Sequence, residues 1–434
     1  MRNNIVHIGA DELTYEIRGI LKIAKKLEET GLQMTWENIG DPVAKGHTLP
    51  KWMKEIIANQ MEDDLSFAYC PTKGLDATRE FLAEKNNNRN GAQITSEDIL
   101  FFNGLGDAIS TFYHYVRKEA RVLGPAPAYS THSSAEAAHA GSHHLTYNLD
   151  PNNNWMPDID DIYNKVKYNP QVSGILLINP DNPTGAVYSK ETMKKIIGIA
   201  KEFDLFIVVD EIYMNTTYNQ KQHIALAEVI GDTPGVSMKG ISKDFPWPGS
   251  RCGWIESYNT DKDPIFARFI KSLEDAKMLE VCSTTLPQKV IPEIMSHKNY
   301  DLYHQERNKF FEKRSQEIYK TLKDVQGIKV NLSNGAFYFS FAFEQSALNE
   351  KQTLPISNEA FKVIEPELNK IEHDYQLDKQ FCLYLMAKTG ICMVPLSSFN
   401  CNIPGLRMTL LEADDKKFTK TCKTLKENIE EYLN

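Results

Sequence analysis

Two basic residues stand close together in the chain, in surroundings that suit covalent chemistry. Lys243 ends residues 240–243, Gly-Ile-Ser-Lys, and Arg251 comes eight positions later. A lysine near a second cation and an apolar stretch, here residues 245–248, has a lowered pKa and is a better nucleophile. The planar guanidinium of Arg251 suits a phosphate. The ordinary alternatives are a solvated surface lysine and a surface ion pair.

Two motifs upstream of the lysine supply an amide, a carboxylate and a phenol. Asn182 lies in residues 179–185, Asn-Pro-Asp-Asn-Pro-Thr-Gly, while Asp210 and Tyr213 lie in residues 208–213, Val-Val-Asp-Glu-Ile-Tyr. A carboxylate that ends a buried strand is costly unless a cation such as a protonated pyridine nitrogen pairs with it, and that pair keeps the ring an electron sink. The amide and the phenol would bind ring oxygens. A turn, a helix cap and a packed core ring are the simpler explanations, but with the lysine and arginine these groups are what pyridoxal phosphate requires.

Two further candidates would bind the charged ends of ligands. Gly104 and Leu105 follow an apolar run and open an expected helix, whose N-terminus presents free amides to an anion. Arg407 lies in residues 405–409, Gly-Leu-Arg-Met-Thr, and a two-pronged grip on a carboxylate would fix the Cα–H bond of a substrate perpendicular to the ring. A common glycine turn and a salt-bridged strand arginine are the alternatives.

The order of these motifs over residues 36–412 resembles the class I/II aminotransferase family of fold-type I pyridoxal-phosphate enzymes. The resemblance implies a homodimer with a shared active site, which moves an amino group between an amino acid and a 2-oxo acid by a ping-pong mechanism. It also implies that Lys243 carries the cofactor as a Schiff base and then moves the proton. Asp210 would bind the pyridine nitrogen, and Tyr213 and Asn182 the phenolic oxygen.

The remaining site residues are also assigned by resemblance. Tyr129, in Pro-Ala-Tyr, matches the aromatic residue that stacks on the ring, and Tyr69 matches a tyrosine that reaches the phosphate from the other subunit. Arg407 matches the arginine that binds the substrate α-carboxylate, and Gly40 the glycine whose backbone faces the substrate. The phosphate cup is matched by Gly104, Leu105, Ser242 and Arg251.

The substrate side chain is less well specified. Residues 15–19, Tyr-Glu-Ile-Arg-Gly, resemble the branch that contains alanine aminotransferases. Residues 282–287 contain no arginine matching the one that reads a side-chain carboxylate in the aspartate-specific branch. We therefore expect alanine or aspartate with 2-oxoglutarate, without strict aspartate specificity.

The pattern of apolar residues predicts an α/β fold with a mostly parallel sheet sandwiched by helices. Residues 99–102, 174–178 and 206–209 are continuous apolar runs, as expected for strands buried on both faces. Helical periodicity separates them, with helices expected at 108–116 and 190–203. In such sheets ligands bind at the carboxyl ends of the strands, where the candidate residues fall.

The sequence pattern at the two ends of the chain predicts a smaller α+β domain. Helices are expected at 11–30, 302–323, 376–389 and 414–432, and strands at 328–330, 336–340 and 406–410. We expect residues 1–48 and 318–434 to form a small domain that closes over the substrate, and residues 49–317 to form the large cofactor-binding domain. Residues 345–375 are polar and weakly periodic, which favours an insertion or a flap.

Composition limits the class of protein. The 434 residues carry a net charge of −9 without a basic stripe, which argues against a nucleic-acid partner. No apolar run approaches the ~20 residues of a membrane span, and no secretory segment is expected. The seven cysteines form no Cys-x-x-Cys pair, which favours a reducing cytoplasm. Cys392 and Cys401 have no histidine near them in sequence, so we expect no metal site.

Two alternative functions remain open at this point. A β-eliminating lyase or a decarboxylase would use the same cofactor and fold, because the outcome depends on which Cα bond lies perpendicular to the ring. A cofactor-binding regulator without catalysis is a second alternative. It would need a basic DNA-binding module, and none precedes Tyr15.

Overall fold

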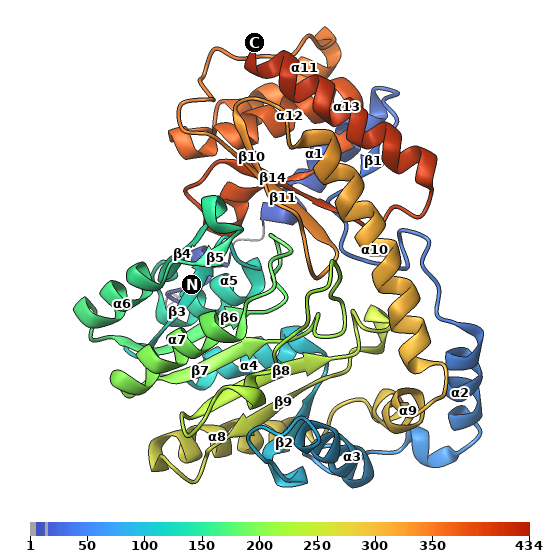
Figure 1. Cartoon of the computed structure of the whole chain (residues 1–434), viewed down its shortest axis with the longest axis vertical. Coiled ribbons are helices and arrows are strands. Elements are labelled where there is room, and N and C mark those ends of the chain that lie inside the picture. The colour runs from blue at the N-terminus through green and yellow to red at the C-terminus, as the bar shows by residue number, and fades with distance from the viewer. Residues whose placement is uncertain (1–5, 14–15) are drawn as a thin grey trace.

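The computed structural model describes residues 6–13 and 16–434, which form two α/β layers joined by a long helix (Figure 1). The larger layer has an eight-stranded sheet of order β2-β9-β8-β7-β6-β3-β4-β5. The pairs β3–β4, β3–β6, β6–β7 and β7–β8 are parallel, and the remaining pairs are antiparallel. The strands are β2 (Ile99–Phe102), β3 (Arg121–Ala126), β4 (Thr146–Asp150), β5 (Met156–Pro157), β6 (Val172–Ile178), β7 (Phe206–Asp210), β8 (Gly235–Gly240) and β9 (Gly253–Tyr258).

Both faces of this sheet are buried, because successive side chains of each strand point to opposite faces. Ile175 and Leu177 of β6 belong to one core cluster, whereas Leu176 and Ile178 belong to the other. Helices α6, α7, α3 and α9 cover the first face, and α4 and α8 cover the second. The helices of this layer are α2 (Lys51–Met61), α3 (Asp76–Asn87), α4 (Leu105–Tyr115), α5 (Ser130–Ala140), α6 (Ile159–Tyr168), α7 (Lys190–Glu202), α8 (Pro264–Glu280) and α9 (Thr285–Met295).

The smaller layer is built from both ends of the chain. Its antiparallel sheet has the order β10-β11-β14-β13, and a separate parallel pair joins β1 to β12. Helix α10 (Tyr300–Leu322) runs from the large sheet to this layer (Figure 1). The other elements are α1 (Glu16–Glu29), β1 (Thr35–Trp36), β10 (Ile328–Val330), β11 (Tyr338–Phe343), α11 (Asn358–Leu368), α12 (Leu377–Thr389), β12 (Ile391–Cys392), β13 (Val394–Pro395), β14 (Gly405–Thr409) and α13 (Asp415–Leu433).

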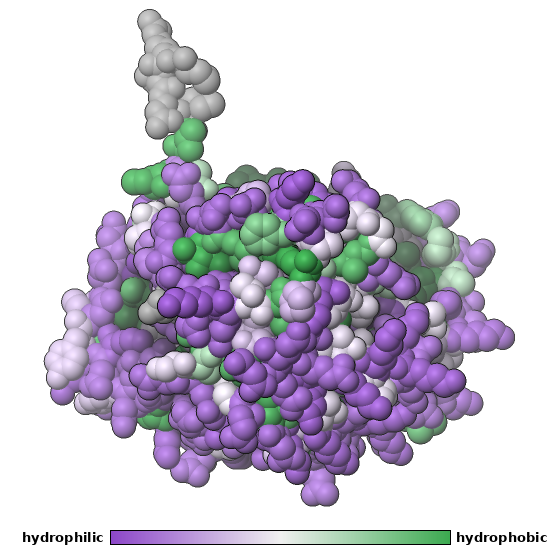
Figure 2. Space-filling model, turned by 90° about the horizontal axis from the view of Figure 1, so that it is seen from above, coloured by the Kyte–Doolittle hydropathy of each residue, from purple (hydrophilic) through white to green (hydrophobic). Residues whose placement is uncertain are grey.

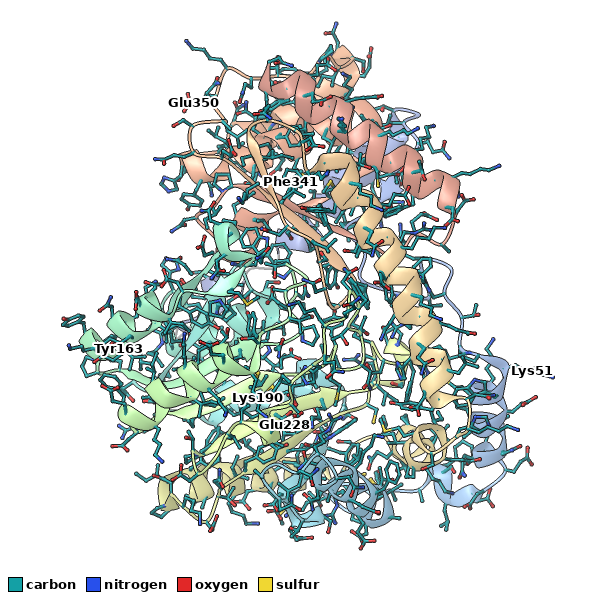
Figure 3. The ribbon with its side chains drawn as sticks, viewed as in Figure 1. Lys51, Tyr163, Lys190, Glu228, Phe341 and Glu350 are labelled. Carbon is teal, nitrogen blue, oxygen red and sulfur yellow. The ribbon has the colours of Figure 1, made fainter. Side chains whose placement is uncertain are left out.

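Residues 345–375, which we expect to be an insertion or a flap, contain a regular helix. Helix α11 lies within them, and its Ala360 and Ile364 are buried in the core of the small layer together with Leu354. Figure 3 shows Glu350 at the outer edge of this segment, whereas Phe341 of β11 lies in the interior. Part of this segment therefore completes the small core.

The N-terminal helix is shorter than the expected 11–30. A 3₁₀ turn spans Ala10–Glu12, and α1 begins at Glu16. Tyr15 lies outside the described residues, and the side chains of residues 16–18 are likewise not described. The alanine-branch motif of residues 15–19 therefore stays a sequence prediction.

The surface is mixed in character. Figure 2 looks onto the end formed by the small layer, which is largely hydrophilic with a narrower hydrophobic band. None of the helices within residues 6–13 and 16–434 combines the length and apolar composition needed to cross a membrane.

Candidate active site

The carboxyl ends of the parallel strands bring the chemically distinctive loops together. Ile178, the last residue of β6, pairs in register with Asp210 of β7, and Asp210 pairs with Met238 of β8. Three features therefore lie side by side at this edge. They are the loop with Asn182, Asp210 at the end of β7, and the lysine loop (residues 241–247). This is the edge at which open α/β sheets bind ligands.

Lys243 is held at this edge by a residue from the N-terminal part of the chain. Its Nζ donates a hydrogen bond to the carbonyl oxygen of Gly40 at 2.8 Å. Burial lowers the pKa of Lys243 to about 8, assisted by the charges of Arg307, Arg251 and Arg407 and opposed by Asp41. A larger fraction of the amine is therefore neutral and nucleophilic than in an ordinary lysine.

Asp210 is fixed by a buried histidine that the sequence analysis missed. Oδ2 of Asp210 lies 3.1 Å from Nε2 of His132, and Oδ1 accepts the backbone N–H of Ile212 at 3.0 Å. Nδ1 of His132 lies 3.5 Å from the hydroxyl of Tyr113. The only available signal was the position of His132 one helical turn after Tyr129. Donation by an Nε2–H would stabilise the carboxylate that the site requires.

Two tyrosines meet beside the aspartate. The hydroxyl of Tyr213 donates to that of Tyr338 at 3.3 Å, and the pKa of Tyr213 is raised, chiefly by burial. Tyr338 is a second residue that the sequence analysis did not single out, although it lies in an expected strand. Asn182 is also buried, and its Oδ1 has no hydrogen-bond partner among the described residues. A buried amide end without a partner is the feature that a polar ligand would satisfy.

An anion would find several donors beside Arg251. Gly104 has φ 84° and precedes the first residue of α4, Leu105. This positive φ favours glycine, and a Cβ at Gly104 would lie 2.6 Å from NH2 of Arg251, whose guanidinium would have to move. Arg251 donates to the carbonyl oxygens of Pro248 and Asn103 at 3.1 and 3.4 Å. The guanidinium therefore lies next to the unpaired amides of a helix N-terminus, which attract anions.

Arg407 reaches the same region from the small layer. It is buried on β14, donates to the carbonyl oxygen of Asn38 at 2.6 Å, and lies 4.5 Å from the ring centroid of Tyr338. A Cβ at Gly40 would overlap the hydroxyl of Tyr338. The segment with Asn38 and Gly40 is therefore packed between Arg407, Tyr338 and Lys243.

The other predicted residues differ in how close they come to this group. Ser242 is buried in the lysine loop, and Tyr129 is half-buried at the start of α5, the helix that carries His132. Tyr69 is 83% exposed and lies on the surface of this chain. Its predicted role would thus depend on a second subunit.

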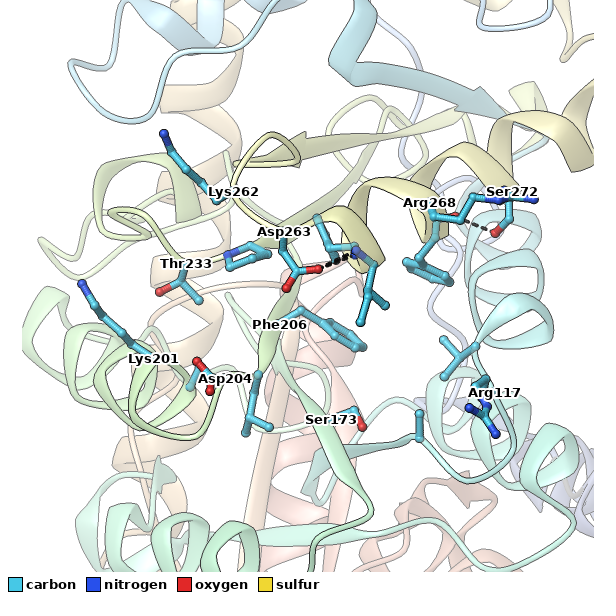
Figure 4. Close-up of a pocket in the computed structure, with 18 of the residues that line it drawn as sticks. Arg117, Ser173, Lys201, Asp204, Phe206, Thr233, Lys262, Asp263, Arg268 and Ser272 are labelled. Carbon is cyan, nitrogen blue, oxygen red and sulfur yellow. Dashed lines mark hydrogen bonds between the residues drawn. The ribbon is translucent and has the colours of Figure 1, made fainter.

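A separate cavity of about 830 Å³ lies at the opposite edge of the sheet (Figure 4). Ser173, Phe206 and Thr233 line it, and these residues lie at or beside the amino ends of β6, β7 and β8. Figure 4 shows the Lys201 and Lys262 side chains extending away from Phe206. None of the predicted site residues lines this cavity. Within the described part of the chain, no group of three or more His, Cys, Asp or Glu residues is arranged to hold a metal ion.

Comparisons with known proteins identify the family of the chain. The sequence model of the family described as aminotransferase class I and II matches residues 35–425. An uncharacterized aminotransferase of Methanocaldococcus jannaschii is 58% identical over 436 residues, covering 100% of both chains. The glutamate-pyruvate aminotransferase of Escherichia coli is 30% identical over 332 residues, covering 76% of this chain and 80% of that one. The structure of an alanine aminotransferase from Pyrococcus furiosus superimposes with a TM-score of 0.83 at 25% identity, over 98% of this chain and 99% of that one.

Proposed function

The chain belongs to the class I and II aminotransferase family and is an aminotransferase, and from that premise we propose that it uses pyridoxal phosphate to move an amino group between an amino acid and a 2-oxo acid. The observation that carries the proposal is the amine of Lys243, partly buried and with a lowered pKa, at the carboxyl edge of the sheet. Asp210 ends β7 at the same edge, and Arg251 lies in the loop between β8 and β9. Family membership does not favour the alternatives of elimination or decarboxylation.

The residues present fit the cofactor. When bound, pyridoxal phosphate supplies a ring that withdraws electrons from the substrate Cα. Lys243 would hold it through a Schiff base, and its amine would then move a proton at the substrate Cα. Asp210, oriented by His132, would hold the ring nitrogen, and Tyr213 would donate to the phenolic oxygen.

The remaining cofactor contacts would come from Asn182, from Tyr129 and from the residues around Arg251. The Nδ2 amino group of Asn182 would donate to the phenolic oxygen. Tyr129 would stack on the ring. The phosphate would lie against Gly104, Leu105, Ser242 and Arg251.

Arg407 would bind the α-carboxylate of the substrate, with the backbone of Gly40 facing the same molecule. The guanidinium is buried and held by Asn38, so its orientation is set before a substrate arrives. We propose alanine or aspartate with 2-oxoglutarate as the substrates. The name of the Escherichia coli relative pairs glutamate with pyruvate, and the Pyrococcus furiosus neighbour is named an alanine aminotransferase, which favours alanine with 2-oxoglutarate.

We propose that a second copy of the chain completes the site. Leu65 and Phe67 are 70% and 64% exposed, and Tyr69 follows them on the same surface segment. A twofold partner would cover these side chains, and Tyr69 would then reach the phosphate of that partner. The proposed small domain comprises residues 1–48 and 318–434, and the large domain residues 49–317. Seven free cysteines support a cytoplasmic location.

Reductive trapping tests the cofactor assignment directly. The protein is incubated with pyridoxal phosphate, reduced with borohydride and digested, and we expect the modified peptide to carry the label on Lys243. A label on another lysine, or none, would overturn the proposal. Unreduced holoenzyme is then given single amino acids without a 2-oxo acid. Conversion to the pyridoxamine form supports transfer, whereas release of ammonia with pyruvate supports a lyase.

A further inference from the structure

Helix α10 carries buried polar side chains directly behind the lysine loop. Arg307 is 8% exposed, and its NH1 donates to the main-chain carbonyl oxygen of Asp244 at 3.0 Å. The hydroxyl of Tyr303 donates to the same oxygen at 3.3 Å. Because Asp244 directly follows Lys243, two side chains of α10 fix the main chain next to the amine-bearing residue.

The same helix also contacts the loop after β7 (residues 211–217). Nδ2 of Asn215 donates to Oδ2 of Asp244 at 2.6 Å and to the hydroxyl of Tyr300 at 3.2 Å. Nδ2 of Asn308 donates to the carbonyl oxygen of Asn215 at 2.9 Å. Asn215 lies two residues after Tyr213, so α10 sets the position of the loops that carry Lys243 and Tyr213 together.

Further along α10, Arg314 contacts the chain that follows the substrate-binding strand. Its Nε and NH2 donate to the carbonyl oxygens of Glu412 and Ala413 at 3.0 and 3.2 Å. Glu412 and Ala413 follow shortly after the end of β14, the strand that carries Arg407. A single helix thus contacts the segments that carry the amine, the phenol and the carboxylate-binding guanidinium.

We propose that Arg307 is a positioning residue for Lys243, which holds the lysine loop through the carbonyl of Asp244 and places a permanent positive charge near the amine. This inference rests on the proposed function, because it assigns Arg307 a part in the same site. It adds a residue outside the cofactor-binding motifs, on an element that the sequence motifs do not include.

The charges around the two residues support this assignment. Among the cations that lower the pKa of Lys243, Arg307 has a larger effect than Arg251 or Arg407, while Asp41 opposes all three. Arg307 itself faces Asp244, His304 and His47. Burial raises the pKa of Asp244 to about 6, opposed by Arg307, and Oδ2 of Asp244 is taken by Asn215. NH2 of Arg307 has no hydrogen-bond partner in the described residues, so the guanidinium is not fully paired.

The test compares three variants of the holoenzyme. Arg307→Met removes the charge and the hydrogen bond, and Arg307→Lys keeps the charge but replaces the planar guanidinium with an ammonium of different reach and geometry. Lys309→Met removes an exposed charge from the same helix as a matched control. The absorption band of the lysine-bound cofactor is titrated against pH, and kcat is measured at saturating substrate.

For Arg307→Met we expect the titration midpoint to rise by about one pH unit, because a nearby like charge is lost, together with a fall in kcat. Arg307→Lys should keep the wild-type midpoint but not the wild-type kcat, and Lys309→Met should match wild type in both. A folded Arg307→Met enzyme with an unchanged midpoint and kcat would overturn the proposal.

Tyr303→Phe covers the case in which Arg307→Met does not fold. It removes the second hydrogen bond to Asp244 without changing any permanent charge, so we expect a lower kcat at an unshifted midpoint. An unchanged kcat in this variant, with a wild-type kcat for Arg307→Lys, would also reject the positioning role. If the wild-type protein itself forms no absorption band with pyridoxal phosphate, the proposed function fails instead, and the two failures are thus distinguishable.

Discussion

Nζ of Lys243 donates to the carbonyl oxygen of Gly40 at 2.8 Å, although the two residues are 203 positions apart in the chain. Lys243 lies in the loop that follows β8 of the large sheet, whereas Gly40 lies in the segment that leads from the small layer to α2. The same segment contacts Arg407 through Asn38. The N-terminal segment is therefore the shared contact of the amine and of the residue proposed to bind the substrate carboxylate, and its packing should affect both.

The first prediction concerns Gly40→Ala. The new Cβ would overlap the hydroxyl of Tyr338, so the segment must shift, and we expect a loss of stability of ~1–3 kcal/mol together with a higher KM for the amino acid. The matched variant is Gly40→Ala with Tyr338→Phe, in which the overlapping oxygen is absent. Thermal unfolding and steady-state kinetics of both single variants and the double variant would check it. Strictly additive losses would show that the overlap is not the cause.

The second prediction concerns Arg407→Ala. A buried guanidinium that binds a carboxylate should contribute ~2–5 kcal/mol to amino-acid binding, so the substrate concentration needed for the half-reaction should rise steeply. Arg407→Lys should recover only part of this, because an ammonium lacks the two-pronged geometry. The affinity for pyridoxal phosphate serves as the control and should change little. Wild-type KM and kcat in Arg407→Ala would remove this residue from the site.

The sequence predicts the large sheet well because its signals are local. The apolar run of residues 99–102 coincides with β2, and the helix expected at 190–203 is observed at Lys190–Glu202. In such segments burial on both faces and helical periodicity are visible in a short window of residues. The loops between them carry the motif residues, so the carboxyl edge could also be anticipated.

The sequence does not reveal contacts that depend on distant parts of the chain. The pairing of β1 with β12 joins Thr35–Trp36 to Ile391–Cys392, two residues on each side, and no local pattern marks it. Helix α11 was missed because it is short and contains Pro366, which usually argues against a helix interior. His132 and Arg307 are likewise ordinary helix residues in the sequence until the fold places them against Asp210 and the main chain of Asp244.

The third prediction concerns His132→Ala. Loss of the His132 contact to Oδ2 of Asp210 leaves that oxygen buried without this donor, and removal of a hydrogen bond to a charged group costs ~1.5–3 kcal/mol. We expect kcat to fall by about tenfold or more, with weaker retention of the cofactor. His139→Ala, on the same helix but only partly buried, is the control for general damage to α5. Equal kinetics in both variants would show that His132 is not specifically coupled to Asp210.

The fourth prediction concerns the cost of keeping Lys243 as a reactive amine. Its pKa is lowered from 10.5 to about 8 in the folded chain, so between these values the unfolded chain binds more protons and folding stability rises with pH. Below pH 8 both states are protonated and the folded protein carries the full penalty, which corresponds to ~3 kcal/mol.

Lys243→Met removes the charge, so the variant without cofactor should be more stable than wild type at pH 7. The difference should shrink between pH 8 and 10.5 and disappear above that range. Denaturant unfolding of both apoproteins across this range measures it, and a wild-type apoprotein as stable as the variant at pH 7 would mean that the Lys243 amine is not destabilised by its surroundings.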